Sequence, residues 1–110
     1  MSLTSWLGIA ALGGTGAIAR FLLDGAVSSR AGTAFPWGTL AVNASGSFAL
    51  GVVGTNVVVG TGLLGAYTTF STWMLETHRL AEDGRWRPAV FNIVGSLAVG
   101  LAAAWLGRQL

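Results

Sequence analysis

The amino-acid sequence predicts an all-α membrane protein with four transmembrane helices. Of its 110 residues, 53% are hydrophobic and only 9% are charged. A soluble domain of this size carries roughly 25% charged residues, so this chain has too little charge to cover a surface in water. Four stretches are long and apolar enough to cross a bilayer as a helix, which takes about 20 residues. The length fits a single transmembrane domain, 1–110, with the lipid bilayer as its solvent.

The first two predicted spans are separated by one polar connection. Residues 4–23 form the first span, with Arg20 in its last turn. A polar segment follows, and Pro36 and Trp37 then suit a helix that begins at the membrane surface. The second span covers residues 37–56 and contains no charged residue. Because the connections are short, successive helices are expected to run antiparallel.

The third predicted span, residues 60–78, contains an interruption near its middle. Gly65 is followed by the run TTFST at 68–72, and this composition is poor for a helix. A helix broken inside a bilayer is tolerated only where protein or a water-filled cavity satisfies the freed backbone groups. The fourth span is predicted over residues 88–107. The sequence therefore predicts three continuous helices and one broken mid-span.

The segment between the last two spans, residues 76–87, holds most of the charge and is predicted to be a solvated loop. His78 is the only histidine, and Glu82 alone shares helical spacing with it, which is too few ligands for a zinc site. No catalytic triad, pair of catalytic carboxylates or phosphate-binding loop can be assembled, so the chain is not predicted to be an enzyme. The net charge of +2 comes from scattered arginines without a basic cluster. Nucleic-acid binding is therefore not predicted.

Two of the predicted helices carry polar stripes at four-residue spacing, which places side chains on one face. The stripe residues are Thr39, Asn43, Ser47, Gly51 and Thr55 in the second helix, and Asn92, Ser96 and Gly100 in the fourth. An asparagine in hydrocarbon is costly unless a partner meets its amide, so these faces are expected to contact protein or water. They are either helix-packing stripes or the walls of a polar pathway. Ser96, Gly100 and Ala104 also allow close helix approach, which favours association into an oligomer.

Aromatic and hydroxyl side chains surround the predicted break. Phe70 and Trp73 are three residues apart and share a face once the helix resumes. Ring edges are electropositive and hydroxyls are donors, so the rings with Ser71 and Thr72 can stabilise a dehydrated anion. In broken transporter helices, freed carbonyls hold cations and half-helix N-termini face anions. The aromatic pair can also be simple packing, but beside the break and the stripes it favours an anion pathway. Arg20 either extends to the interface or sets a positive potential at the mouth of that pathway.

Four motifs carry a resemblance to a known family. They are GGTGAIARF at 13–21, PWGTLAVNASG at 36–46, GAYTTFSTW at 65–73 and NIVGS at 92–96. In these motifs, and over essentially its whole length, the chain resembles the Fluc (CrcB) family of bacterial fluoride channels. The resemblance implies four-helix subunits in the bacterial inner membrane that pair as an antiparallel dimer with two fluoride pores. It also implies passive export of cytoplasmic fluoride.

The resemblance assigns roles to residues of the pathway. Arg20 matches the vestibule arginine, Asn43 the pore asparagine and Phe70 the first pore phenylalanine. Ser71 and Thr72 match the hydroxyls between the two phenylalanines of the family. Together with the polar stripes, the predicted fluoride pathway comprises Arg20, Thr39, Asn43, Phe70, Ser71, Thr72, Trp73 and Ser96.

The resemblance also implies a sodium ion, and the chain departs from the family pattern near it. Main-chain carbonyls of Gly65 and Thr68 would bind the ion at the dimer centre, where it is structural and not transported. Trp73 stands in place of the second phenylalanine, and its replacement by phenylalanine is expected to keep or raise conduction. Ala66 and Tyr67 replace the usual glycine and apolar residue. The link between the second and third helices, NVVVGTG, is shorter than usual.

Alternatives to a complete homodimeric channel remain open. One is a non-conducting or half-conducting partner subunit of a heterodimeric channel. Another is a small proton-coupled multidrug exporter, which needs an acid deep in a span, whereas Glu76 lies at the end of its span. The charge distribution bears on the partner, because arginines near span ends set orientation. One side of the predicted topology has Arg30, Arg79, Arg85 and Arg87, and the other has Arg108. This bias predicts both termini outside and a paralogue of opposite orientation, while dual insertion would give a homodimer.

Overall fold

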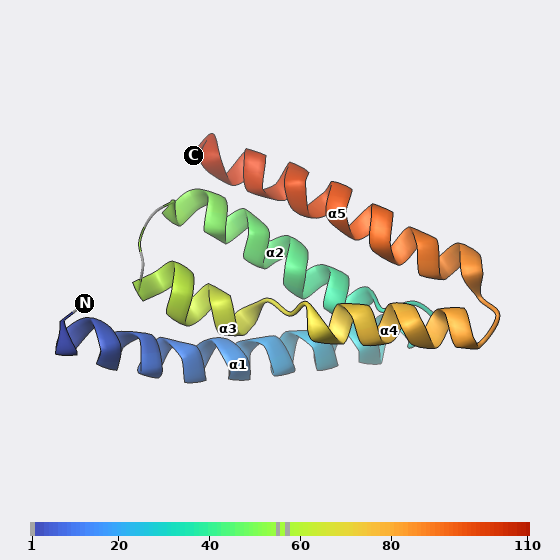
Figure 1. Cartoon of the computed structure of the whole chain (residues 1–110), viewed down its shortest axis with the longest axis horizontal. Helices are drawn as coiled ribbons and strands as arrows, with labels where there is room; N and C mark the ends of the chain where they lie inside the picture. Colours follow the sequence, from blue (N-terminus) through green and yellow to red (C-terminus); the bar gives the residue numbers. More distant parts are fainter. Residues whose placement is uncertain (1, 55, 57) are drawn as a thin grey trace.

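The computed structural model describes residues 2–54, 56 and 58–110, and its regular elements are all helical (Figure 1). They are α1 Leu3–Ala31, α2 Trp37–Val53, the π-helix η1 Val58–Leu64, α3 Gly65–Tyr67, α4 Ser71–Glu82 and α5 Trp86–Arg108. The helices follow the long axis of a body measuring 49 × 28 × 23 Å. Both termini lie at one end, and the α1–α2 and α4–α5 connections lie at the other. Successive long helices therefore run antiparallel, as expected.

Helix α1 is longer than the predicted first span. It begins after Ser2, whose hydroxyl accepts a hydrogen bond from the Ser5 amide at 3.2 Å. The helix continues beyond Asp24 because the following polar residues do not break it; the Ser28 hydroxyl donates to the Asp24 carboxylate at 3.1 Å, within the helix. It ends at Gly32, which adopts a positive φ of 82°. The polar connection to α2 is correspondingly shorter than predicted.

Helices α2 and α5 form the most extensive helix pair of the chain. A Cβ atom on Gly51 would overlap the Ala104 carbonyl, and one on Gly107 would overlap the Phe48 carbonyl. Glycine is therefore needed at both positions for the two backbones to approach this closely. Gly100 also lies on this seam, opposite the Ser47 hydroxyl. The small-residue stripe expected to favour association between subunits is thus used within the subunit.

The predicted interruption of the third helix is present. Helix α3 ends at Tyr67, residues 68–70 are not helical, and α4 begins at Ser71. Helix α4 then runs to Glu82, so the prediction of a solvated loop from residue 76 is wrong for 76–82. The segment is helical because it is amphipathic. Trp73, Thr77 and Leu80 recur at helical spacing and are buried, while His78, Arg79 and Glu82 are exposed on the outer face.

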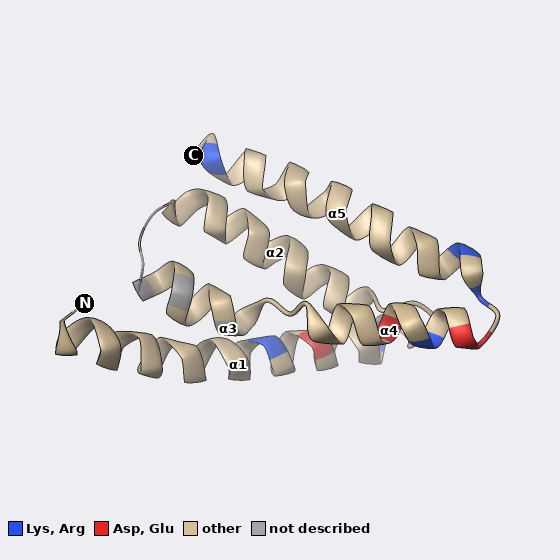
Figure 2. Cartoon of the chain, in the orientation of Figure 1, with Lys and Arg blue, Asp and Glu red and all other residues tan. Residues whose placement is uncertain are grey.

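The outer surface of the chain is apolar, and its charge is concentrated toward one end. Helices α1 and α5 are long and apolar enough to cross a membrane, and α2 is a shorter apolar helix of 17 residues. Large side chains such as Phe21 and Leu101 are more than 70% exposed. Apart from Arg20 and Arg108, the charged residues lie toward the end that holds the α1–α2 and α4–α5 connections (Figure 2). The surface matches a chain surrounded by lipid, with its polar end at an interface.

Candidate functional site

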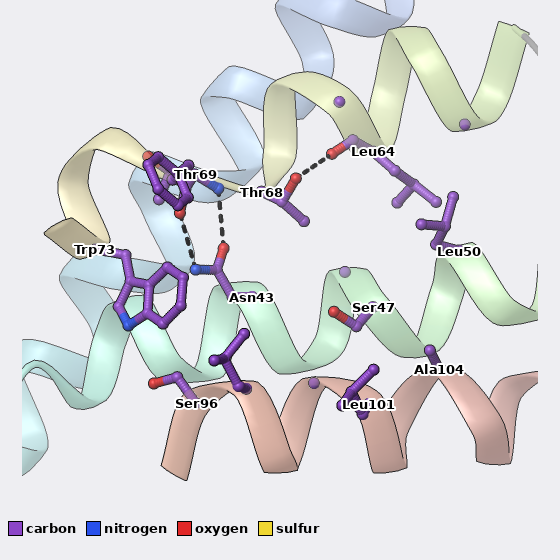
Figure 3. A pocket seen from close by; sticks show the side chains of 16 residues that line it. Asn43, Ser47, Leu50, Leu64, Thr68, Thr69, Trp73, Ser96, Leu101 and Ala104 are labelled. Carbon is purple, nitrogen blue, oxygen red and sulfur yellow. Dashed lines mark hydrogen bonds between the residues drawn. The ribbon is translucent and has the colours of Figure 1, made fainter. Parts of the chain in front are cut away.

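A groove of about 430 Å³ lies between α2, the segment from η1 to the start of α4, and α5 (Figure 3). Its walls are largely apolar. Six of the residues predicted for the fluoride pathway or the sodium site line it, namely Asn43, Gly65, Thr68, Phe70, Trp73 and Ser96. Part of each polar stripe, Asn43 and Ser47 on α2 and Ser96 and Gly100 on α5, therefore meets the interruption at one cavity. The remaining described stripe residues lie outside it, so the polar pathway stays a prediction.

The Asn43 side chain holds the interruption in place. Its Nδ2 donates to the Thr69 carbonyl at 2.9 Å, and its Oδ1 accepts from the Thr69 amide at 2.9 Å (Figure 3). The pair of bonds satisfies both backbone groups of Thr69, the middle of the three residues between the two helical segments. Backbone groups in an apolar environment require such partners. Asn43 thus substitutes for the missing helical hydrogen bonds at Thr69.

The hydroxyls of the interruption also serve its backbone. Thr68 Oγ1 donates to the Leu64 carbonyl at 2.9 Å, and Thr69 Oγ1 accepts from the Thr72 amide at 3.3 Å. The second contact satisfies one of the unpaired amides at the start of α4, as a capping residue does. The sequence alone predicted no role for Thr69. The sequence signal for this role is a threonine placed three residues before an amide in the first turn of a helix, which is the spacing of a capping residue.

Helix α2 packs directly against the interruption. A Cβ atom on Gly46 would overlap the Thr68 side chain and press on the Tyr67 ring. The Tyr67 hydroxyl lies 2.7 Å from the Ser45 hydroxyl, so this departure from the family pattern adds a polar contact to α2. The side chain of Ala66 and the stripe residue Thr55 lie outside the part of the chain that the structure describes. The interruption is therefore supported on its α2 side by a glycine, an amide and a hydroxyl.

The carbonyls of Gly65 and Thr68, the residues implied for sodium, lose their helical partners at the interruption. In an unbroken helix the Thr69 amide would bind the Gly65 carbonyl, but it binds Asn43 instead. The Thr72 amide would bind the Thr68 carbonyl, but it binds Thr69 Oγ1. Hard cations such as sodium prefer oxygen ligands of this kind. The donor chemistry of Gly65 and Thr68 therefore fits the expected ion, and in the described residues no cluster of three acidic, histidine or cysteine ligands offers a different metal site.

Trp73 belongs to a buried hydrogen-bond cluster that joins α4 to α5. Its Nε1 donates to the Asn92 carbonyl at 2.8 Å. Asn92 Nδ2 in turn donates to Thr77 Oγ1 at 2.8 Å, and Thr77 Oγ1 donates to the Trp73 carbonyl at 2.9 Å. Asn92 is fully buried, while Trp73 and Thr77 are each 9% exposed. Ser96 is attached to the same cluster, since its hydroxyl lies 3.4 Å from Asn92 Oδ1.

Phe70 has the opposite environment to Trp73. Its side chain is 69% exposed, although it lines the groove. The Phe70 and Trp73 rings meet edge to face, with centroids 5.7 Å apart and planes at 82°. This arrangement is the preferred geometry for two aromatic rings. Of the two aromatic residues predicted for the pathway, Phe70 is accessible and Trp73 is anchored behind it.

The other predicted pathway residues do not line the groove. They are Arg20, Thr39, Ser71 and Thr72. Thr39 is 2% exposed and donates to Glu76 Oε1 at 2.5 Å, which ties α2 to α4. Arg20 is half-buried on α1, a helix that contributes no side chain to the groove. Ser71 is exposed in the first turn of α4, directly after Phe70 in the chain.

These features define a small helical membrane protein whose apolar surface encloses a polar, interrupted segment. Comparison with known families identifies it further. The family described as "CrcB-like protein, Camphor Resistance (CrcB)" matches residues 7–108, and the chain belongs to this family. The resemblance expected from the four motifs is confirmed.

Several relatives are similar over nearly the full length. A protein of Mycolicibacterium paratuberculosis named fluoride-specific ion channel FluC 2 is 51% identical over 112 residues, covering 96% of this chain and 92% of the relative. The FluC 2 protein of Mycobacterium tuberculosis is 46% identical, covering 100% of this chain and 93% of the relative. A FluC 1 protein of Symbiobacterium thermophilum is 46% identical, with 96% of each chain covered. Both numbered forms of the channel name thus occur among the relatives.

Proposed function

We propose that this chain is a subunit of a fluoride-selective channel that lets cytoplasmic fluoride leave a bacterial cell passively across the inner membrane. The observation that carries the proposal is the interrupted helix at the groove, where Phe70 is accessible beside hydroxyl groups. Ring edges and hydroxyl donors can replace the water around a small anion. The names of the relatives give the ion its identity. In this proposal Asn43 acts by bonding the Thr69 backbone and so fixing the interrupted segment. Because Asn43 also lines the groove, its side-chain amide lies close to the pathway.

A second subunit completes the groove in this proposal. Phe70 lies at a cavity that opens on the surface of one chain, and much of the surrounding surface is apolar. A partner packed there in antiparallel orientation would cover the groove and bring two interruptions together. The released carbonyls of Gly65 and Thr68 would then hold a structural sodium ion between subunits. The carbonyl dipoles would stabilise this ion between the subunits, and it would not be carried across the membrane.

The partner is either a second copy or an oppositely oriented paralogue. The concentration of arginine toward the α4–α5 end supports a fixed orientation, since such residues stay on the cytoplasmic side. The occurrence of FluC 1 and FluC 2 names among the relatives supports paired paralogues. In that case this chain contributes one half of a heterodimeric channel. The burial of Trp73 favours the same possibility, because Phe70 is then the only accessible one of the two aromatic residues predicted for the pathway.

Reconstitution of the purified chain alone tests the proposal. Liposomes loaded with potassium fluoride and traces of radioactive sodium are diluted into fluoride-free buffer, and a fluoride electrode records efflux after a potassium ionophore is added. We expect fluoride to leave while the sodium stays inside. Release of chloride at the same rate would contradict fluoride selectivity, and sodium release in proportion to fluoride would contradict a structural ion. Efflux that appears only after addition of a paralogue would establish the heterodimer.

A further inference from the structure

The indole of Trp73 is committed to the protein and is not free to meet an ion. Its single polar atom, Nε1, donates to the Asn92 carbonyl of α5 at 2.8 Å. An indole has no second donor and no acceptor in its ring plane. With 9% of the residue exposed, the hydrogen bond is shielded from water. Trp73 therefore contributes a fixed ring to the groove, and its polar edge faces away from the pathway.

The cluster around Trp73 makes this position rigid. Asn92 Nδ2 donates both to Thr77 Oγ1 at 2.8 Å and to the Trp73 carbonyl at 3.4 Å. Thr77 Oγ1 returns a bond to the same carbonyl at 2.9 Å. In the described part of the chain, no buried side-chain nitrogen or oxygen lacks a partner. A fully satisfied buried network of this kind holds its members in one arrangement. The first two turns of α4 are thereby attached to α5.

Phe70 receives its support from this anchored ring. It lies at the boundary between the interruption and α4, where no side chain caps the helix from its own position. Its side chain is 69% exposed, and within the described residues Trp73 is the aromatic ring that it contacts. The edge-to-face contact defines the angle between the two rings at 82°. Movement of the Trp73 ring would therefore change the orientation of Phe70 at the groove.

We propose that Trp73 is a positioning residue, which uses its N–H bond to Asn92 to hold the Phe70 ring in the orientation that the pathway requires. Phe70 alone then presents its ring to the ion in this subunit. The consequence for transport rests on the proposed channel function, whereas the coupling between the two rings does not. A phenylalanine at position 73 keeps a ring but loses the bond to α5. The structure thus favours reduced conduction for Trp73→Phe, opposite to the expectation from the family pattern.

The first test measures the coupling without transport. The chain is labelled with 4-fluorophenylalanine, and the Phe70 signal in the ¹⁹F NMR spectrum is assigned with Phe70→Leu. Trp73 is then replaced by 3-benzothienylalanine, which keeps the size of the indole and removes only its N–H donor. The same replacement at Trp105, which is 62% exposed, is the matched control. We expect the Phe70 signal to shift or broaden for the replacement at Trp73 and to stay unchanged for the control. An unchanged Phe70 signal in both proteins would overturn the proposal.

The second test measures the effect on transport with a double-mutant cycle. Trp73→Phe is expected to reduce fluoride efflux roughly tenfold, the equivalent of one lost buried hydrogen bond. In a Phe70→Leu background the same substitution is expected to change the remaining efflux by less than about twofold, because its target is absent. Equal effects in both backgrounds, in proteins of equal thermal stability, would overturn the positioning role. Absence of efflux from the parent, both alone and together with a paralogue, combined with a shifted Phe70 signal, would reject the channel function and leave the positioning role intact.

Discussion

The α2–α5 pair and the interrupted segment from Gly65 to Trp73 place backbone in the same apolar interior by opposite means. In the pair, each helix satisfies its own backbone, and glycines at the seam let the two approach closely. In the interrupted segment, side chains satisfy the backbone, with Asn43 bonding both backbone groups of Thr69 and the Thr69 hydroxyl accepting from the Thr72 amide. The first region depends on the absence of side-chain atoms, and the second on specific polar atoms. Substitutions should therefore fail for different reasons in the two regions.

The largest loss of stability is expected in the α2–α5 pair. Gly51→Ala places a Cβ atom into the Ala104 carbonyl, which belongs to the backbone and cannot rotate away. We expect a cost of about 2–3 kcal/mol from overpacking, measured by thermal unfolding in detergent. Gly14→Ala is the control, because a Cβ atom there meets nothing within 4 Å. It should be neutral or stabilising, since alanine favours a helix more than glycine. Similar effects of the two substitutions would contradict the close packing of the seam.

Asn43→Asp should disrupt the hydrogen bonds that hold the interrupted segment, although the two side chains are nearly equal in size. The carboxylate keeps an acceptor for the Thr69 amide but turns a second oxygen toward the Thr69 carbonyl. An unsatisfied and repelling group in this position is expected to cost about 1–3 kcal/mol. Fluoride efflux should be lost, and hydrogen exchange at the Thr69 amide should accelerate. Ser47→Ala, one turn along the same face of α2, is the control. Unchanged exchange at Thr69 in the Asp variant would show that the side chain does not hold the interruption.

Thr69→Val isolates the hydroxyl that caps α4. The side chain keeps its shape, but the Thr72 amide loses its acceptor. Loss of a capping oxygen is expected to cost about 1 kcal/mol, which lowers the unfolding temperature without disrupting the assembly. Thr15→Val serves as the control, because the Thr15 hydroxyl donates only to the Ala11 carbonyl on the exposed side of α1. If both variants unfold at the temperature of the parent protein, the hydroxyl of Thr69 contributes nothing to the start of α4.

Phe70→Ile is expected to change stability least of these substitutions, although it should strongly reduce transport. The Phe70 side chain is 69% exposed in the single chain, so its substitution should alter the free energy of unfolding by less than about 0.5 kcal/mol. Isoleucine retains bulk but has no electropositive ring edge, so fluoride efflux should fall sharply. The measurement compares efflux and thermal unfolding on the same preparation. Efflux equal to that of the parent would reject the aromatic-edge mechanism.

The two regions also differ in how far the sequence predicts them. The continuous helices were predictable because length and hydropathy act locally, although α1 runs on to Gly32 where polar residues suggested a loop. The interruption was predictable from Gly65 and the threonines that follow it. Its support was not, because the partner of Asn43 lies 26 residues away and a polar stripe does not identify what it contacts. The anchoring of Trp73 was hidden for the same reason, since its acceptor is a backbone carbonyl that any residue would supply.

The order of the helices along the chain decides when the bonds between Asn43 and Thr69 can form during synthesis. Helix α2 leaves the ribosome before the interrupted segment, and chains begin to fold from the N-terminus. The Asn43 side chain, which bonds the Thr69 backbone, is therefore already synthesised when Thr69 is added to the chain. Helix α5, which carries the acceptor for Trp73, comes last. The third segment therefore packs against α1 and α2, which precede it, and the contact between α4 and α5 forms last.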